Sequence, residues 1–176
     1  GEGTCTYGVG GGTYEGQWTR DRREGVGRLE SRAGESYEGE WLADRPHGTG
    51  TRVGADGSRE EGQFGWGALH GAATRLDALG NVWRGVFVGG LLQGEGACEV
   101  DGASYAGGFA DGLYDGHGRC TEADGSEYVG SWQRGLHHGH GKLKRPDGSE
   151  YEGEWAHGSR SRRHSNPPAL PGRSTA

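Results

Sequence analysis

The chain has 176 residues, of which 40 are Gly and only 30% are hydrophobic. That composition excludes an ordinary two-layer globule, because Leu, Ile and Val are too few to fill its core. Six Trp, seven Tyr and three Phe residues exclude a plain disordered chain. The net charge of −6 is uneven, since residues 157–176 hold four Arg and no acid. We therefore expect a repeat protein with an acidic body and a basic tail.

A pentapeptide that starts as YEGQW at Tyr14 returns along the whole chain. Its seven copies are spaced by about 23 residues and begin at Tyr14, Tyr37, Glu60, Trp83, Tyr105, Tyr128 and Tyr151. A second element, GxGxΦ, follows each of the first six copies, and in four repeats an Asp-Gly turn, at Asp56, Asp101, Asp124 or Asp147, separates it from the next copy. Short segments with alternating side chains predict strands, and short connections predict hairpins. The predicted fold is all-β: an elongated, single-layer antiparallel meander of stacked β-hairpins.

The pairing of these strands follows from their spacing. If Trp18 lies opposite Gly25, then Tyr14 lies opposite Leu29, and the same register continues through every strand without a slip. One face then carries a middle row of Gly between two rows of largely aromatic side chains. Rings from both rows can fold over the Gly backbone and bury surface there, which explains why Gly is kept. The opposite face carries charged side chains and is expected to be solvated.

The motif YEGEW at 37–41, followed by HGTG at 47–50, resembles the MORN repeat (membrane occupation and recognition nexus). The resemblance covers residues 1–156, as seven YEGxW units and a leading half repeat, and it is specific because the motif recurs in register. It implies a curved stack of hairpins with a non-catalytic role as scaffold, adaptor or tether. It also implies a binding groove on the aromatic face. Neither enzymatic activity nor a cofactor is expected.

The third repeat departs from this pattern, because Glu60 replaces Tyr and Ala73 replaces Gly. The register places Glu60 between Arg52 and Arg75. One interpretation is a decayed repeat with three solvated charges. Another is an Arg–Glu–Arg ladder that replaces the aromatic contacts. A third is that this polar notch, which consists of Arg52, Glu60 and Arg75, is a docking point for a partner.

No catalytic or metal site is expected. Cys5, Cys98 and Cys120 share the Φ position of the repeat, so we interpret them as small apolar fillers. The eight His residues lack the ligand spacing of a zinc site. The GxG pieces are not followed by the helix that a dinucleotide-binding fingerprint needs. An odd number of cysteines favours a reducing compartment.

A protein partner, either a helix or an extended segment, is expected to bind along the aromatic–glycine groove. The expected anchors, which could equally be structural only, are Tyr37, Trp41, Trp83, Phe87, Tyr105, Tyr128 and Trp132. The alternative functions are a phosphoinositide or membrane tether and a regulatory repeat segment of a larger enzyme. The expected location is cytoplasmic, at the cytoskeleton or a cilium, or peripheral to a membrane. No nucleic-acid partner is expected.

The ends of the chain carry further predictions. Residues 157–176, rich in Ser, Arg and Pro, are predicted to form a disordered tail. Its Arg160, Arg162 and Arg163 are interpreted either as part of a plain linker or as a contact for anionic lipid. The first strand, GEGTC at 1–5, is expected to leave an unpaired edge that is open to end-to-end self-association. Because the chain starts without Met, we interpret it as a fragment.

Overall fold

The computed structural model describes residues 1–8 and 11–160, which form one antiparallel sheet with its strands in chain order. The strands are β1 (Glu2–Thr6), β2 (Thr13–Thr19), β3 (Arg22–Glu30), β4 (Ser36–Leu42), β5 (Arg45–Val53), β6 (Arg59–Gly65), β7 (Ala68–Leu76), β8 (Val82–Val88), β9 (Leu91–Val100), β10 (Ala103–Ala110), β11 (Leu113–Thr121), β12 (Glu127–Gln133), β13 (Leu136–Lys144), β14 (Glu150–Ala156) and β15 (Ser159–Arg160).

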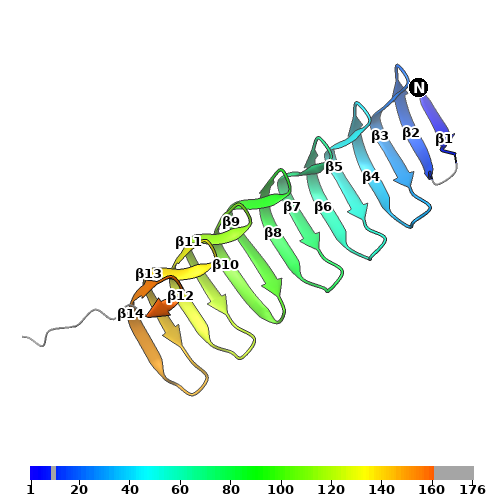
Figure 1. The fold of residues 1–176 in the computed structure, drawn as a ribbon. Coiled ribbons are helices and arrows are strands. Elements are labelled where there is room, and N and C mark those ends of the chain that lie inside the picture. Colours follow the sequence, from blue (N-terminus) through cyan, green and yellow to red (C-terminus); the bar gives the residue numbers. More distant parts are fainter. Residues whose placement is uncertain (9–10, 161–176) are drawn as a thin grey trace, which may run out of the picture.

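The sheet is a row of hairpins one layer thick. Figure 1 shows the hairpins following one another from the blue N-terminal end to the orange C-terminal end, with each strand beside the next strand of the chain. In the part of the chain that the structure describes, no helix is long and apolar enough to cross a membrane. The predicted all-β, single-layer antiparallel meander is confirmed.

The sheet continues into the range that the sequence assigns to the tail. Strand β15 pairs with β14, so that Arg160 lies opposite Trp155. The Arg160 guanidinium also lies 4.6 Å from the centre of the Tyr151 ring, within the range of a cation–π contact. Arg160 therefore belongs to the last repeat and not to a free tail. The other two basic residues predicted to act in the tail, Arg162 and Arg163, lie outside the described residues.

Each YEGxW strand is joined to the following strand by a two-residue turn with left-handed backbone. In the first of these turns, Arg20 and Asp21 have φ values of 49° and 60°, as in a type I′ hairpin turn. In later turns the second residue also bonds to the preceding hairpin. In the turn at 43–44, for example, the Asp44 N–H donates to the Arg23 carbonyl at 3.1 Å. Neighbouring hairpins are thus tied together along this edge of the sheet. We call it the short-turn edge; its turns lie at 20–21, 43–44, 66–67, 89–90, 111–112, 134–135 and 157–158.

The register inside each hairpin differs from the prediction. Between repeats the pairing is as predicted, with Gly25 opposite Trp41. Within the first hairpin, however, the pairing shifts after the middle Gly, and Trp18 lies opposite Arg23 instead of Gly25. The same shift recurs in the five following hairpins. The predicted continuous register is therefore wrong, because every GxGxΦ strand carries a β-bulge.

The side chain before the last ring of YEGxW stabilises this bulge in the first repeats. Gln17 Oε1 accepts the Val26 N–H at 3.1 Å, and Glu40 Oε1 accepts the Thr49 N–H at 2.8 Å. These acceptors satisfy a backbone N–H that the bulge removes from the ladder between the strands. Glu40 is thus a structural residue, although its face of the sheet is solvated. Val86 stands at this position in the fourth repeat and has no acceptor to offer.

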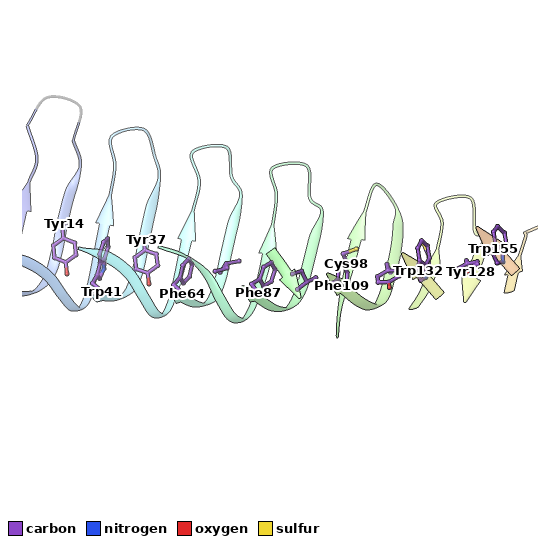
Figure 2. Packing of buried hydrophobic residues seen from close by; sticks show 14 residues of the cluster. Tyr14, Tyr37, Trp41, Phe64, Phe87, Cys98, Phe109, Tyr128, Trp132 and Trp155 are labelled. Atoms are coloured by element: carbon purple, nitrogen blue, oxygen red, sulfur yellow. The ribbon is translucent and has the colours of Figure 1, made fainter. Parts of the chain in front are cut away.

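The two faces of the sheet differ as predicted. The face opposite the rings, here called the outer face, exposes Glu15, Gln17, Glu38, Glu40, Arg84, His117, His140, Lys142, Glu152 and Glu154. The other face, here called the aromatic face, carries a continuous row of facing glycines that only Ala73 interrupts. The core of the protein lies on this aromatic face and runs along the length of the array (Figure 2).

The fifth repeat shows how the core is built. The Tyr105 hydroxyl donates to the Gly108 carbonyl at 2.9 Å, and the ring lies over Gly118. A Cβ at Gly118 would overlap the Tyr105 hydroxyl and ring carbons. Edge-to-face contacts at 5.2 Å and 5.3 Å join this ring to Phe109 and Trp132. The rings therefore bury surface against backbone and against one another, without a second layer.

Substituting Gly118 tests this packing. Gly118→Ala is expected to lower the free energy of unfolding by about 3 kcal/mol, because the added methyl group displaces the Tyr105 ring. Gly116→Ala, two residues earlier on the same strand, is the matched control. Gly116 has open space around it and a φ of 87°, so its substitution should cost only about 1 kcal/mol of backbone strain. Equal losses in chemical denaturation would contradict the role of the glycine row.

Candidate functional site

Six of the seven aromatic residues predicted as partner anchors are buried. Tyr37, Trp41, Phe87, Tyr105, Tyr128 and Trp132 are each at most 5% exposed. The seventh, Trp83, is partly exposed and lies between Arg75 and Cys98 on the neighbouring strands. Rings with so little exposed surface cannot make the first contacts with a partner. The structure therefore places these six rings in the core.

The polar atoms of the buried rings are occupied within the sheet. The Tyr37 hydroxyl donates to the Glu40 carbonyl at 3.0 Å, and Trp41 Nε1 donates to the Gly27 carbonyl at 3.0 Å. Burial raises the pKa of Tyr37 and of Tyr128 to about 12. These hydroxyls remain protonated at neutral pH and donate to carbonyls beside the bulges, whereas the Trp41 indole donates to a carbonyl of the glycine row.

The shifted register creates a row of core positions that the sequence pattern did not reveal. The row contains the residues opposite the last ring of each YEGxW: Arg23, Pro46, Leu69, Leu92, Tyr114 and His137. Leu69 and Leu92 are almost fully buried. Tyr114 stacks on Tyr105 with 3.8 Å between ring centroids. The sequence signal common to all of them is a position two residues before the first Gly of GxGxΦ.

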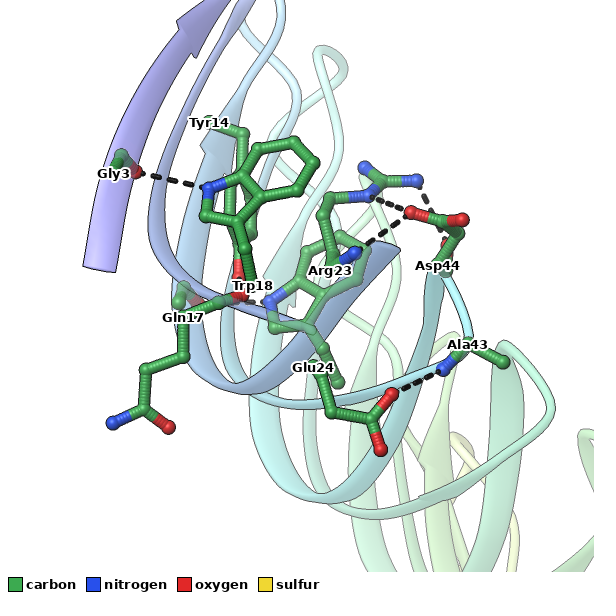
Figure 3. A network of polar contacts seen from close by, with 10 residues as sticks. Gly3, Tyr14, Gln17, Trp18, Arg23, Glu24, Ala43 and Asp44 are labelled. Carbon is green, nitrogen blue, oxygen red and sulfur yellow. Dashed lines mark hydrogen bonds and ion pairs between the residues drawn. The ribbon is translucent and has the colours of Figure 1, made fainter. Parts of the chain in front are cut away.

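In the first repeat a cation occupies this position. The Arg23 guanidinium lies 4.3 Å from the centre of the Trp41 ring, and Arg23 Nε donates to Asp44 Oδ1 at 3.3 Å. Figure 3 shows the Arg23–Asp44 pair and a second link between the same repeats, in which Glu24 Oε2 accepts the Ala43 N–H at 3.2 Å. The first repeat is thereby fastened to the turn of the second by charged groups on both faces of the sheet.

A cavity of about 320 Å³ opens on the aromatic face beside this pair. Leu29, Trp41 and Pro46 contribute apolar walls, and charges of both signs come from Arg23, Glu35, Asp44 and Arg52. Pro46 stands at the position that holds a stacked ring in the fifth repeat. Because its side chain is small, the space over the neighbouring rings remains open. The cavity is large enough for one or two side chains of a partner.

The polar notch is an ion-pair ladder. Arg52 Nη1 lies 2.9 Å from Glu60 Oε2, and Arg75 Nη2 lies 2.9 Å from Glu60 Oε1. The Glu60 side chain is only 18% exposed. The two guanidiniums lie over neighbouring rings, at 5.1 Å from Phe64 and 5.4 Å from Phe87. Of the interpretations of this repeat, the ladder is thus the one that the structure shows, and the arginines take the place of the missing tyrosine contacts.

Removing the shared carboxylate is expected to destabilise the notch. Glu60→Ala would leave two guanidiniums side by side with no anion between them, at a cost of about 2 kcal/mol. The neighbouring Glu61→Ala removes an exposed pair with Arg59, which contributes at most about 0.5 kcal/mol. Thermal unfolding of the two variants measures the difference. Equal melting temperatures would mean that the three charges are simply solvated.

His137 lies in a cage of three rings. It stacks on Tyr128 with 3.7 Å between centroids and contacts Trp132 at 4.5 Å and Trp155 at 5.0 Å. Burial lowers its pKa from the ordinary value of 6.5, against a smaller opposing effect of the Glu122 charge. The cage therefore holds a neutral imidazole, and a proton on His137 disfavours the folded state.

The stability of the C-terminal repeats should consequently depend on pH. Because the folded-state pKa of His137 is lowered, the unfolded chain binds more protons below about pH 6.5, so stability falls as the pH drops. The melting temperature is expected to fall less between about pH 7.5 and about pH 5.5 in His137→Tyr than in the wild type. The exposed His140→Tyr serves as the control. An unchanged pH dependence in His137→Tyr would contradict this assignment.

Two of the three cysteines, Cys98 and Cys120, are fillers of the core. Cys98 and Cys120 are buried, and all three cysteines are free thiols. Burial, aided by the Glu122 charge, raises the pKa of Cys120 to about 12, so this thiol is a poor nucleophile at neutral pH. Cys98 Sγ lies 3.1 Å from the Tyr114 hydroxyl. Among residues 1–8 and 11–160, no three His, Cys, Asp or Glu side chains are placed to hold a metal ion.

The comparison with protein families agrees with this architecture. A model of the MORN repeat matches residues 14–36, 37–59, 105–127, 128–150 and 151–161, more than half of the chain. The chain belongs to the MORN-repeat family. MORN repeats generally mediate interactions with proteins or membranes, and the repeat itself is generally non-enzymatic. No curated protein matches the chain.

The matched MORN repeats are those whose pentapeptide begins with Tyr. Residues 60–104 lie between the matched ranges, and their two pentapeptides begin with Glu60 and Trp83. The same residues hold most of the ion-pair ladder and the bulge without an acceptor at Val86. The middle of this MORN array thus keeps the fold while departing from the sequence pattern of the family.

Proposed function

We propose that this MORN array is a non-catalytic scaffold that holds a protein partner against its aromatic face. The observation that carries the proposal is the cavity over β3, β4 and β5, which opens to solvent and combines apolar walls with charged side chains of both signs. A helix or an extended segment could place an apolar side chain in the cavity and a carboxylate beside Arg52. The buried rings support this surface from below and keep it rigid.

Two further observations support an adaptor role in a reducing compartment. Cys98 and Cys120, which flank Tyr105 on the two neighbouring strands, are free and buried in the core, where oxidation would disrupt packing. The sheet extends through 15 strands in one row, so sites on different repeats can hold different proteins at fixed separations. We extend the proposal to a cytoplasmic setting at cytoskeletal or ciliary assemblies, where a long rigid connector would be useful.

The charge of the array disfavours a membrane tether. Residues 1–160 hold 16 Lys and Arg against 25 Asp and Glu, a net charge of −9. An anionic phosphoinositide surface repels such a body. A membrane role would therefore depend on the basic residues Arg162 and Arg163. The third alternative, a regulatory segment of a larger enzyme, is compatible with the same cavity and differs only in what is attached to the chain.

Filling the cavity tests the proposal. Pro46→Tyr should stack on Tyr37, as Tyr114 stacks on Tyr105 three repeats later, and close the space without disturbing the fold. Proteins retained from a cell extract by the immobilised wild-type chain should bind Pro46→Tyr at least tenfold less, by quantitative mass spectrometry. Thr51→Tyr, an outer-face substitution on the same strand, should retain them.

A separate measurement addresses the membrane alternative. The full chain and its Arg162→Ala/Arg163→Ala variant are mixed with phosphoinositide vesicles at physiological salt and separated by flotation. Neither is expected to float with the vesicles. Equal retention of proteins by Pro46→Tyr and the wild type would remove the cavity as the binding site, and flotation of both chains would put the membrane first.

A further inference from the structure

A stripe of exposed apolar side chains follows the short-turn edge across the middle and C-terminal part of the sheet. Its members are 47–64% exposed; they are Trp66, Val86, Val88, Leu91, Leu113 and Leu136. They make up six of the nine large apolar side chains that are exposed within residues 1–8 and 11–160. The other three are Val26, Leu79 and Val129. Exposed apolar side chains that gather along one edge in this way are typical of an interaction site.

Side chains of the stripe approach the neighbouring strand or the next short turn at three places. Val88 and Leu91 lie directly opposite each other on β8 and β9. Leu91 also approaches the next short turn, because its Cδ2 lies 3.7 Å from the point that a Cβ would occupy if Gly112 had a side chain. Leu136 repeats this arrangement, with its Cδ2 3.6 Å from the corresponding position on Gly158. The five stripe residues within strands alternate with residues of the aromatic face and therefore lie on the outer face, whereas Trp66 lies in a short turn.

Trp66 begins the stripe at an unfavourable position. It is the first residue of a short turn, with a φ of 54° and 64% of its surface exposed. A bulky aromatic residue in the left-handed region is strained, and exposure of the ring gains little in return. Its aromatic contact, His47, is 6.0 Å away. A strained and exposed Trp is well suited to anchor a partner, since buried Trp residues dominate the energy of many interfaces.

The spacing of the stripe fits an α-helix. Leu91, Leu113 and Leu136 occupy equivalent positions in successive repeats, and each repeat adds two strands at about 4.8 Å each. The resulting period of about 9.6 Å is close to two helical turns of 5.4 Å. A helix lying across the short turns could therefore contact the stripe with an apolar side chain at every seventh residue. Three repeats, from Trp66 to Leu136, would accommodate a helix of about 20 residues.

The charge around the stripe indicates the chemistry of that helix. Residues 61–136, which include the whole stripe, contain ten Asp and Glu against four Arg, a net charge of −6. Glu95 and Asp111 are exposed near the apolar side chains, and neither forms an ion pair with another described residue. A second copy of this chain would bring the same carboxylates together, which disfavours self-association through the stripe. Lys and Arg on the partner would be attracted instead.

We propose that the outer face along the short-turn edge is a second docking surface, and that its partner is a basic amphipathic α-helix. The helix places its apolar side on Trp66, Val88, Leu91, Leu113 and Leu136, and its Lys or Arg residues near Glu95 and Asp111. This surface is independent of the cavity on the aromatic face. The scaffold can then hold one protein on the aromatic face of its first two repeats and another on the outer face of the repeats that follow.

The test uses a labelled synthetic helical peptide of about 20 residues, with Leu at heptad positions and Lys elsewhere. Fluorescence anisotropy measures its binding to the full chain. Val88→Gln/Leu113→Gln is expected to weaken binding at least tenfold, whereas Val26→Gln/Val129→Gln, which changes two exposed valines outside the stripe, should change it less than twofold. The same peptide with Glu in place of Lys should not bind. Pro46→Tyr should bind the peptide as the wild type does, which separates this proposal from the first.

Trp66→Asn supplies a variant that cannot lose binding by unfolding. Asn adopts the left-handed conformation readily, so the melting temperature should stay the same or rise, while peptide binding weakens severalfold. Three results would overturn the proposal. They are equal affinity for the wild type and Val88→Gln/Leu113→Gln, equal binding of the Glu peptide, and a dimer in sedimentation that Val88→Gln/Leu113→Gln abolishes, which would assign the stripe to a second copy.

Discussion

The close approach of aromatic rings to bare backbone is the constraint on which the rest of this structure depends. A single-layer sheet has no second layer to cover its apolar face, so each ring must cover the strand beside it. That is possible only where the covered residue is Gly, as at Gly118 beneath Tyr105. The ring hydroxyl then bonds to a carbonyl at the bulge, three residues along its own strand. One contact therefore fixes the glycine row, the position of the bulge and the burial of the rings together.

The part of this fold that depends on the repeated spacing of the motifs can be predicted from the sequence. Equal spacing of the motifs sets the pairing between repeats, and the order of the rows on the aromatic face follows from it. The bulge could not be predicted, because a GxG segment does not show that three of its residues face one residue of the partner strand. Its consequence, the burial of Leu69 and Leu92 opposite the rings, was hidden for the same reason.

The functional surfaces were harder to predict than the fold. The sequence does not show whether an aromatic side chain of the repeat is buried or exposed. Tyr128 and Trp132, which were expected to contact a partner, are core residues. For Glu60 the sequence brings three charges into register, but only the side-chain distances distinguish a ladder from separate solvated groups. The regular repeats therefore specify the architecture, while the departures from them create the surfaces that a partner could distinguish.

The ladder at Glu60 also bears on how the chain finds its fold. Repeats that resemble one another can pair in the wrong order, because most strands offer the same glycine and the same ring to any neighbour. Glu60 is an exception, since its carboxylate is satisfied only between Arg52 and Arg75. A tyrosine hairpin inserted there would leave the two guanidiniums without their anion, and Glu60 placed elsewhere would be half-buried without a cation. The irregular repeat thus favours one set of neighbours for its hairpin, which the Tyr repeats by themselves do not.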